Sequence, residues 1–187
     1  MRLEAADAPR VDLAGPTRLE HDLLGDREVP AGALYGIQTL RAIENFNISG
    51  IELREFPTLV AAIATVKEAA ALANYEMKLI DRDIVDAISQ AAGEIREGLH
   101  HEHFRVDMIQ GGAGTSTNMN ANEVMANRAI EILGKERGHY DMLHPNHHVN
   151  LRPSTTAVSP PPSNLALHTT LAAPQPPTTP PAAPLSA

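Results

Sequence analysis

The chain has 187 residues, of which 43% are hydrophobic, so it is long enough to build one ordinary domain around an apolar core. It carries 23 acidic and 15 basic residues, and this excess of negative charge argues against a nucleic-acid partner or an anionic membrane surface. The absence of cysteine excludes disulfides, thiolate metal sites and a cysteine nucleophile. No apolar run is typical of a secretory signal or approaches the roughly 20 residues of a membrane span, so we expect a cytoplasmic protein.

The first segments of the chain are poor in regular patterns. Residues 1–17 are polar and are predicted to be disordered, and residues 18–150 are predicted to form one domain. Up to residue 46 this domain mixes glycine, proline and short apolar pairs. Such a mixture predicts turns or a short hairpin, followed by helical turns near residues 38–45.

Three longer helices are predicted in the rest of the domain. The first includes Pro57 near its start, the second follows Asp81 as a plausible N-cap, and the third ends at Gly134. Each has apolar residues at steps of three and four, which predicts one buried face per helix. The residues expected on these faces are Leu59, Ile63, Val66, Ala70, Ala73, Met77 and Ile80 in the first helix, Ile84, Ile88, Ala91, Ile95 and Leu99 in the second, and Met119, Glu123, Ala126, Ile130 and Leu133 in the third. The predicted fold class is therefore all-α with a short irregular or hairpin entry.

The composition changes abruptly after residue 150. Residues 151–187 contain ten of the fifteen prolines, and their only charged residue is Arg152. Proline is excluded from helix interiors, and a segment so poor in large apolar residues cannot offset its own ordering entropy. We therefore predict a disordered tail, with a few helical turns as an exception within residues 164–173, which read NLALHTTLAA.

The stretch GGAGTSTNMNANE, residues 111–123, is the one with the most evident chemistry. A Walker-type phosphate loop requires a lysine after the glycines, and none is present here. The dinucleotide pattern G-x-G-x-x-G also fails, because Thr117 stands at the third glycine position. Two interpretations remain: a glycine loop with a Ser/Thr cap that only starts a helix, or an anion site at the helix N-terminus.

The anion interpretation rests on free backbone N–H groups and on nearby side chains. Glycines let an anion approach the backbone, and the positive end of the helix dipole favours a carboxylate or phosphate. Thr115, Asn118 and Asn122 are spaced three and four residues apart, so they are expected on one helix face. Their neutral side chains can orient a small anion, but they supply neither a strong acid nor a strong base.

Three segments in the same order resemble the aspartase/fumarase superfamily. QGGAGTSTNMNANEVMANRA, residues 110–129, resembles its first signature region, and residues 23–46, LLGDREVPAGALYGIQTLRAIENF, and 144–150, HPNHHVN, resemble its flanking sequence. The resemblance covers about residues 19–150. The strings GAGTS at 112–116 and LRAIENF at 40–46 are more similar to aspartate ammonia-lyases than to fumarases.

The resemblance implies an all-α N-terminal domain that is truncated before a long central helical bundle, and an intact family member that forms a homotetramer. It implies the reversible cleavage of L-aspartate to fumarate and ammonia, without a metal or organic cofactor. Thr115 matches the substrate-contacting threonine, with Ser116, Asn118 and Asn120 as nearby support. A fumarase-type hydro-lyase and a non-catalytic helical interaction fragment remain as alternatives.

The chain departs from the family pattern after the HVN element. Ser154 and Thr155 stand where the substrate-binding serine and threonine of a Q-S-T-N-D motif would be expected, but the following asparagine and aspartate are replaced. The family's later loop G-S-S-x-M-P-x-K-x-N, which holds the catalytic serine, has no counterpart in the sequence. We therefore assign no catalytic residue and expect an incomplete, inactive fragment. Either a disrupted reading frame or a natural tail would explain the ending.

Histidines cluster at two places. His144 and Asn146 resemble part of the family's accessory anion site, but His147 replaces the aspartate that is usual there. The string HHEH at residues 100–103 follows the second predicted helix. Metal ligation needs three or four convergent donors with second-shell support, so solvated or helix-capping roles are favoured over a metal site.

Overall fold

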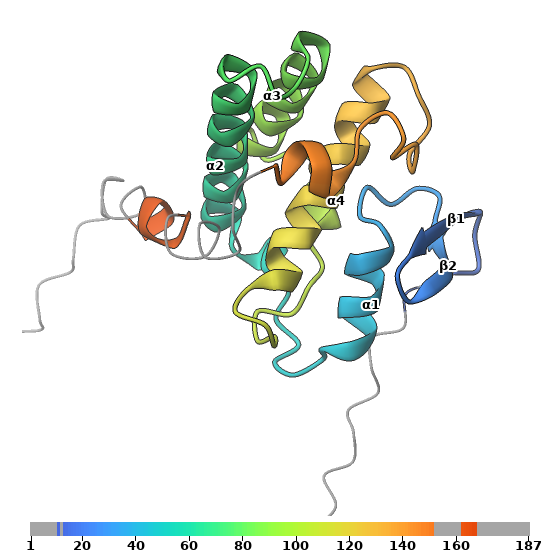
Figure 1. Cartoon of the computed structure of the whole chain (residues 1–187). Coiled ribbons are helices and arrows are strands. Elements are labelled where there is room, and N and C mark those ends of the chain that lie inside the picture. The colour runs from blue at the N-terminus through green and yellow to red at the C-terminus, as the bar shows by residue number, and fades with distance from the viewer. Residues whose placement is uncertain (1–10, 12, 152–161, 168–187) are drawn as a thin grey trace, which may run out of the picture.

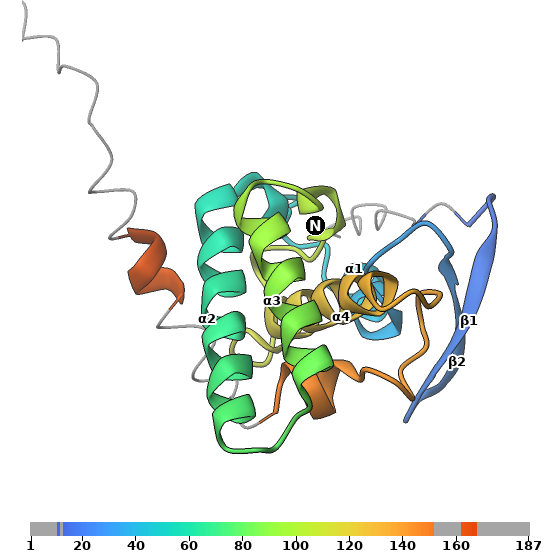
Figure 2. The same cartoon turned by 90° about the horizontal axis from the view of Figure 1, so that it is seen from above.

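The computed structural model of the chain describes residues 11, 13–151 and 162–167 (Figure 1). Two long helices, α2 (Pro57–Glu76) and α3 (Arg82–Arg96), lie side by side, and α4 (Thr115–Ile132) crosses them (Figure 2). A shorter helix, α1 (Ile37–Asn45), contacts α4 and lies between it and a hairpin. The predicted fold class, mostly helical with a small hairpin entry, is confirmed.

The hairpin comprises the antiparallel strands β1 (Thr17–Asp22) and β2 (Gly25–Pro30). Its register places Thr17 opposite Pro30 and Asp22 opposite Gly25. Gly25 has a φ of +105°, which suits glycine at this tight connection. The predicted hairpin and the helical turns near residues 38–45 are therefore confirmed, and α1 contacts both strands.

The starts of α2 and α3 agree with the sequence prediction. Pro57 is the first residue of α2, and Asp81 occupies the N-cap position of α3, although its side chain makes no capping hydrogen bond. Leu99 does not lie on the buried face of α3 as predicted but is 51% exposed. The helix has already ended at Arg96, and Gly98, with a φ of +93°, turns the chain away.

The buried face of α2 also differs from the prediction. Ala73 and Met77 are exposed, so the apolar stripe inferred from the sequence was wrong at these two positions, whereas Ile63 and Ile80 are buried as predicted. The residues that α2 buries are Val60, Ala62, Ile63, Ala64, Lys67, Ala71 and Asn74. Two of them are polar, and they interrupt the apolar pattern from which the buried face was inferred. Asn74 Nδ2 donates to Leu151 O at 2.8 Å, which gives this polar position a structural partner.

The central helix is α4, in which each residue from 118 to 127 is buried. Its predicted inward residues Met119, Glu123, Ala126 and Ile130 are buried as expected. Gly134 has a φ of +77° and donates its N–H to Glu131 O, so the predicted end of this helix is confirmed.

Three short turns complete the described part of the chain: η1 (Leu53–Glu55), η2 (His101–His103) and the π-helical turn η3 (Pro145–Val149). Residues 162–167 are helical and overlap the short helix predicted for residues 164–173. The predicted disorder of residues 1–17 and 151–187 concerns positions that lie largely outside the described ranges. Within those ranges, no helix is both long and apolar enough to cross a membrane.

Candidate functional site

The glycine loop before α4 is a tight left-handed turn. Three successive residues have positive φ: Gly112 at +76°, Ala113 at +51° and Gly114 at +88°. Gly112 O then accepts two hydrogen bonds from Thr115, one from N at 3.1 Å and one from Oγ1 at 2.6 Å. This turn leaves Thr115, the first residue of α4, exposed at the molecular surface.

Gln110 caps the first turn of α4. Its Oε1 accepts a hydrogen bond from Thr117 N at 2.8 Å, and its Nε2 donates to Thr117 Oγ1 at 2.8 Å and to Asp107 O at 2.9 Å. The N-cap position itself is occupied by Gly114, so the Ser/Thr cap considered from the sequence is not present. Gln110 lies four residues before the N-cap residue, and the path of the loop brings its side chain back to the helix start. The spacing of residues in the sequence did not indicate this capping role.

The predicted substrate-side residues do not all face the same way. Thr115 is exposed, and Ser116 is partly exposed and lines a cavity of about 440 Å³ together with Arg41. Arg41 is paired there with Asp22, its Nε lying 2.9 Å from Asp22 Oδ2. Both side chains are accessible from the surface, and their contact with a substrate stays a prediction.

The asparagines of the signature lie inside the fold. Asn120 Nδ2 donates to His103 O at 2.9 Å, so this side chain holds the chain after α3. Asn122 is fully buried, and its Nδ2 contacts Met119 Sδ at 3.5 Å. Thr115, Asn118 and Asn122 were expected to share one helix face and to turn their polar groups toward a common place. This was wrong for Asn122, because its side chain is 0% exposed and packs against Met119, away from the exposed Thr115. Asn118 and Asn120 stay predicted supports of the site, and neither is a surface group.

Lys67 joins two signature segments, and sequence reasoning missed it. Its Nζ donates to Asn118 Oδ1 at 2.6 Å and to Asn150 Oδ1 at 2.7 Å. The side chain is fully buried, and this burial lowers its pKa to about 7. The signal in the sequence was a lysine between the apolar positions Ile63 and Ala71, where a solvated face would not be expected.

Two buried carboxylates hold the N-terminus of α1. Glu123 accepts hydrogen bonds from the backbone N–H groups of Gly36, Gln38 and Thr39 at 2.9 to 3.0 Å. Glu20 Oε2 accepts from Ile37 N at 2.9 Å. Carboxylates at a helix N-terminus satisfy N–H groups that have no partner within the helix. Burial raises the pKa of Glu123 to about 7, and the nearby charge of Glu20 adds to the increase.

We expect Glu123 to make stability depend on pH. Its folded-state pKa of about 7 lies above the ordinary value of 4.5, so its contribution is fully present below pH 4.5 and is lost as the pH rises through 7. The loss should be on the order of 3 kcal/mol. Burial lowers the pKa of His103 to about 4, which changes stability in the opposite direction between pH 4 and 6.5.

The test is therefore the difference between the free energies of unfolding of the wild type and Glu123→Gln, measured by urea denaturation from pH 4.5 to 8. His103 contributes equally to both proteins, so the difference isolates Glu123. The stability advantage of the wild type should shrink toward pH 8. Two parallel curves would contradict the assignment.

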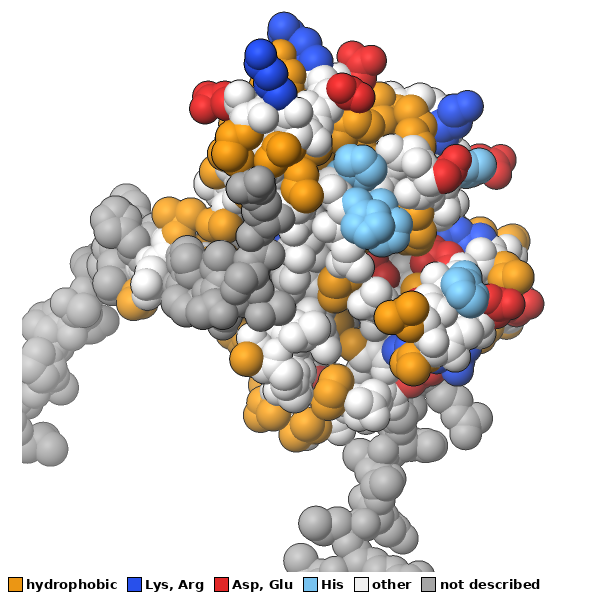
Figure 3. Space-filling model, viewed as in Figure 1, with side chains coloured by type: hydrophobic (Ala, Val, Ile, Leu, Met, Phe, Trp, Pro, Cys, Tyr) orange, Lys and Arg blue, Asp and Glu red, His pale blue; other side chains and the backbone are white. Residues whose placement is uncertain are grey.

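The predicted accessory anion site is a histidine-rich turn at η3. His144 Nδ1 accepts from Asn146 N at 3.0 Å, and the rings of His144 and His147 stack with centroids 4.3 Å apart. His144 N donates to His148 Nδ1 at 2.8 Å. Histidine side chains gather on this face of the molecule (Figure 3). Burial and the neighbouring imidazoles lower the pKa values of His144 and His148, so these two rings favour the neutral form at neutral pH.

The histidines at residues 100–103 support the end of α3. His101 Nε2 lies 2.8 Å from Ile95 O, which confirms the helix-capping interpretation for this residue. His100 Nε2 lies 2.9 Å from Glu94 Oε2. Among the described residues there is no group of three or more His, Cys, Asp or Glu side chains arranged to hold a metal ion.

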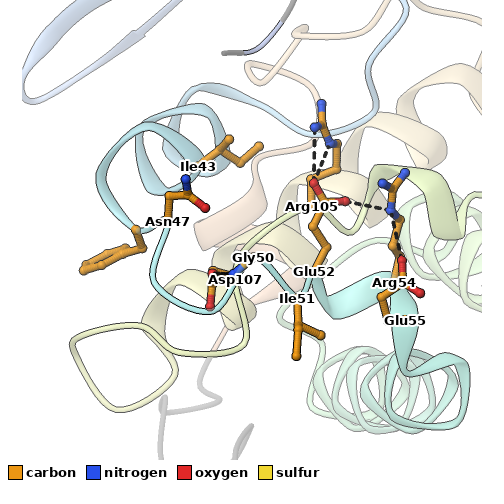
Figure 4. Close-up of a pocket in the computed structure, with 10 residues that line it drawn as sticks. Ile43, Asn47, Gly50, Ile51, Glu52, Arg54, Glu55, Arg105 and Asp107 are labelled. Carbon is orange, nitrogen blue, oxygen red and sulfur yellow. Dashed lines mark hydrogen bonds and ion pairs between the residues drawn. The ribbon is translucent and has the colours of Figure 1, made fainter. Parts of the chain in front are cut away.

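A cavity of about 570 Å³ opens beside the segment that joins α1 to α2, with Arg105 and Asp107 in its wall (Figure 4). Glu52 lies between two arginines, with Arg54 Nε at 2.6 Å and Arg105 Nη2 at 3.2 Å from its carboxylate oxygens. Asp107 forms part of the wall and accepts hydrogen bonds from the turn at Ser49. Because Glu52 already pairs with both guanidinium groups, this cavity is less suited to a dicarboxylate than its arginines alone suggest.

A model of a lyase family matches residues 25–173, which is more than half of the chain. The chain belongs to the aspartase/fumarase family of lyases. The match includes the glycine loop, α4 and the HPNHHVN segment. It also continues beyond residue 150 through the region of Ser154 and Thr155, whose predicted substrate role concerns residues outside the described ranges.

The similar proteins include relatives named aspartate ammonia-lyase and solved structures named fumarate lyase or fumarase. Aspartate ammonia-lyase from Pseudomonas aeruginosa is 54% identical over 160 residues, which cover 84% of this chain and 34% of that protein. The fumarate lyase:delta crystallin structure from Brucella melitensis is 52% identical with a TM-score of 0.82, covering 83% of this chain and 34% of the other.

A class II fumarase from Schistosoma mansoni is 36% identical, with a TM-score of 0.74, and the match covers 81% of this chain and 32% of the fumarase. The chain thus spans about a third of the length of the relatives it matches.

Proposed function

We propose that this chain is the N-terminal part of an aspartate ammonia-lyase-type site for L-aspartate and fumarate. In this proposal, the exposed Thr115 at the start of α4 contacts a substrate carboxylate, with Ser116 beside it. The left-handed turn at residues 112–114 brings the backbone of the helix N-terminus to the surface, where an anion is favoured. Ser154 and Thr155 would contribute a second group of contacts.

The observation that carries the proposal is the exposed Thr115 within a loop sequence shared with the aspartase branch. Fifty-four per cent identity to an aspartate ammonia-lyase, against 36% to a fumarase, favours ammonia over water as the second product. A fumarase-type activity remains the alternative. In this proposal the site is completed by segments from the central helical bundle of a homotetramer. A cytoplasmic location is proposed as well, because the substrates are small metabolites.

The chain by itself should show no aspartate deamination above background. The hydroxyl and amide groups of residues 115–122 can hold a carboxylate, but no neighbouring group in the described part of the chain activates one of them as a base, and the sequence has no counterpart of the catalytic serine in the family's later loop. Loss of a general base commonly removes about 10²–10⁴-fold of rate. The assay would follow fumarate by ultraviolet absorbance and ammonia by a coupled enzyme, with purified chain and L-aspartate.

A chimera tests the same proposal in an active context. Residues 1–150 of this chain would replace the matching part of the Pseudomonas aeruginosa aspartate ammonia-lyase. The chimera should release fumarate and ammonia, and Thr115→Ala should lower its kcat/KM by about 10²-fold, as expected for loss of one preorganised donor. Thr115→Ser, which keeps the hydroxyl, is the matched control and should retain most activity.

Three results would contradict the proposal. Fumarate formation by the chain alone would show that it carries a complete site. A chimera that hydrates fumarate to malate and ignores ammonia would favour the fumarase alternative. A folded, tetrameric chimera whose activity is unchanged by Thr115→Ala would remove Thr115 from the site and favour a non-catalytic interaction role for this domain.

A further inference from the structure

We propose that Lys67 is a positioning residue that orients the side-chain amides of Asn118 and Asn150, so that their Nδ2 groups serve as hydrogen-bond donors toward the bound carboxylate. This inference rests on the proposed function, because it concerns the same wall of the site. Lys67 would act through the two asparagines and would not touch substrate. The three residues come from α2, from the first turn of α4 and from the end of η3.

The orientation of both amides follows from the chemistry of lysine. An ammonium group has three donors and no acceptor, whereas an amide has an oxygen acceptor and an NH₂ donor. Lys67 Nζ lies 2.6 Å from Asn118 Oδ1 and 2.7 Å from Asn150 Oδ1. Turning either amide by 180° would place an NH₂ group against the ammonium. Both oxygens must therefore face Lys67, and both NH₂ groups must face away from it.

The charge of Lys67 has no carboxylate partner among the described residues. The lysine side chain is 0% exposed, and its hydrogen bonds within this part of the chain go to two neutral oxygens. A buried ammonium is costly unless an opposite charge or several dipoles compensate it. An anion held near Asn118 would compensate the charge through the polarised amide, which favours a carboxylate over a neutral ligand at this wall.

The same contacts connect the glycine loop to the HVN segment. Asn118 lies one helical turn after Thr115, so the position of its amide is coupled to the exposed start of α4. Asn150 directly follows η3, and the neighbouring Leu151 is held by Asn74 of α2. Removing the ammonium would release Asn118 and Asn150 together, whereas Asn74 would still hold the backbone of the same segment.

The test uses the full chain labelled with ¹⁵N and follows the side-chain NH₂ resonances of Asn118 and Asn150, assigned through Asn118→Ser and Asn150→Ser. Between pH 5 and 9 both resonance pairs should shift with one common midpoint near 7, the pKa of Lys67. The ¹³Cε resonance of Lys67 should titrate with that midpoint in the wild type, which requires no variant. Lys135→Met, a substitution at an exposed lysine, is the matched control and should leave the titration unchanged.

Two substitutions separate orientation from packing. Lys67→Met keeps an unbranched side chain of similar length, and both amide resonances should lose their common titration. Lys67→Arg keeps a permanent charge and donors, so the amides should stay ordered without titrating. If Lys67→Met does not fold, the wild-type and Lys67→Arg titrations still decide the result. Amide resonances that ignore the ionisation of Lys67 would overturn the inference.

Fumarate is the probe for the donor role. Saturating fumarate should shift the Asn118 and Asn150 NH₂ resonances in the wild type and in Lys67→Arg, and its apparent Kd should rise about tenfold in Lys67→Met, as for loss of one oriented hydrogen bond. A response of the Thr115 backbone without any response of the two amides would overturn the donor role alone. No response at any residue would contradict both the donor role and the proposed carboxylate wall, while the pH titration would still decide whether Lys67 orients the amides.

Discussion

Gly36→Ala is expected to lower the free energy of unfolding by about 3 kcal/mol or more, at the upper end of overpacking effects. A Cβ atom at this position would lie 2.5 Å from Tyr140 Oη, 2.7 Å from Glu20 Oε2 and 2.9 Å from Glu123 Cδ. The backbone of Gly36 is extended, so the cost arises from space alone and not from an unusual φ. To relieve the contacts, the two carboxylates would have to leave the N-terminus of α1.

Gly32→Ala is the matched control for this prediction. A Cβ atom at Gly32 meets no other atom within 4 Å, and its φ is not in the left-handed region. Urea denaturation followed by circular dichroism would compare both variants with the wild type. Gly36→Ala and Gly32→Ala proteins of equal stability would show that the carboxylate cluster does not occupy the space around Gly36.

Asp107→Ala should destabilise the chain by about 2–4 kcal/mol, because several backbone N–H groups lose their acceptor at once. Asp107 Oδ2 accepts from the N–H groups of Ile48, Ser49 and Gly50 at 2.8 to 3.0 Å, and its Oδ1 accepts from Ile109 N at 2.7 Å. These hydrogen bonds are only partly buried, so some of the N–H groups would gain water, which keeps the expected loss below the sum of four separate bonds. The substitution should also loosen the segment that leads into the glycine loop.

Two comparisons test the Asp107 prediction. Asp86→Ala removes an exposed carboxylate from α3 and should change stability by less than about 0.5 kcal/mol. Burial raises the pKa of Asp107, but the hydrogen bonds, led by that of Ser49, outweigh this effect and hold the pKa at about 2, below its ordinary 3.8. The stability contributed by ionised Asp107 is therefore present above pH 3.8 and lost as the pH falls through 2. The free energies of unfolding of the wild type and Asp107→Ala should therefore approach each other as the pH falls from 3.8 to 2. A difference that stays constant over this range would contradict the role of Asp107.

Local signals determined much of the secondary structure. Proline at residue 57, Asp81 before α3 and Gly134 after α4 are residues whose backbone preferences mark helix ends, and the structure confirms all three boundaries. The resemblance of three ordered segments likewise sufficed to predict the lyase family. Helix ends depend on residues close to one another in the sequence, and family membership depends on short sequence motifs, so both can be predicted without the tertiary structure.

The tertiary structure alone decided the partners of the buried polar groups. The spacing of Lys67 from Ile63 and Ala71 hints at burial, but the partners of its ammonium follow only from packing, because α4 brings Asn118 against it and η3 brings Asn150. Glu123 was expected only as a member of a buried face, yet its carboxylate accepts hydrogen bonds from the N-terminus of α1. The partners of Lys67 and Glu123 lie 51 to 87 residues away in the sequence, and a hydrogen bond between distant segments is specified by how the helices pack, which no local periodicity encodes.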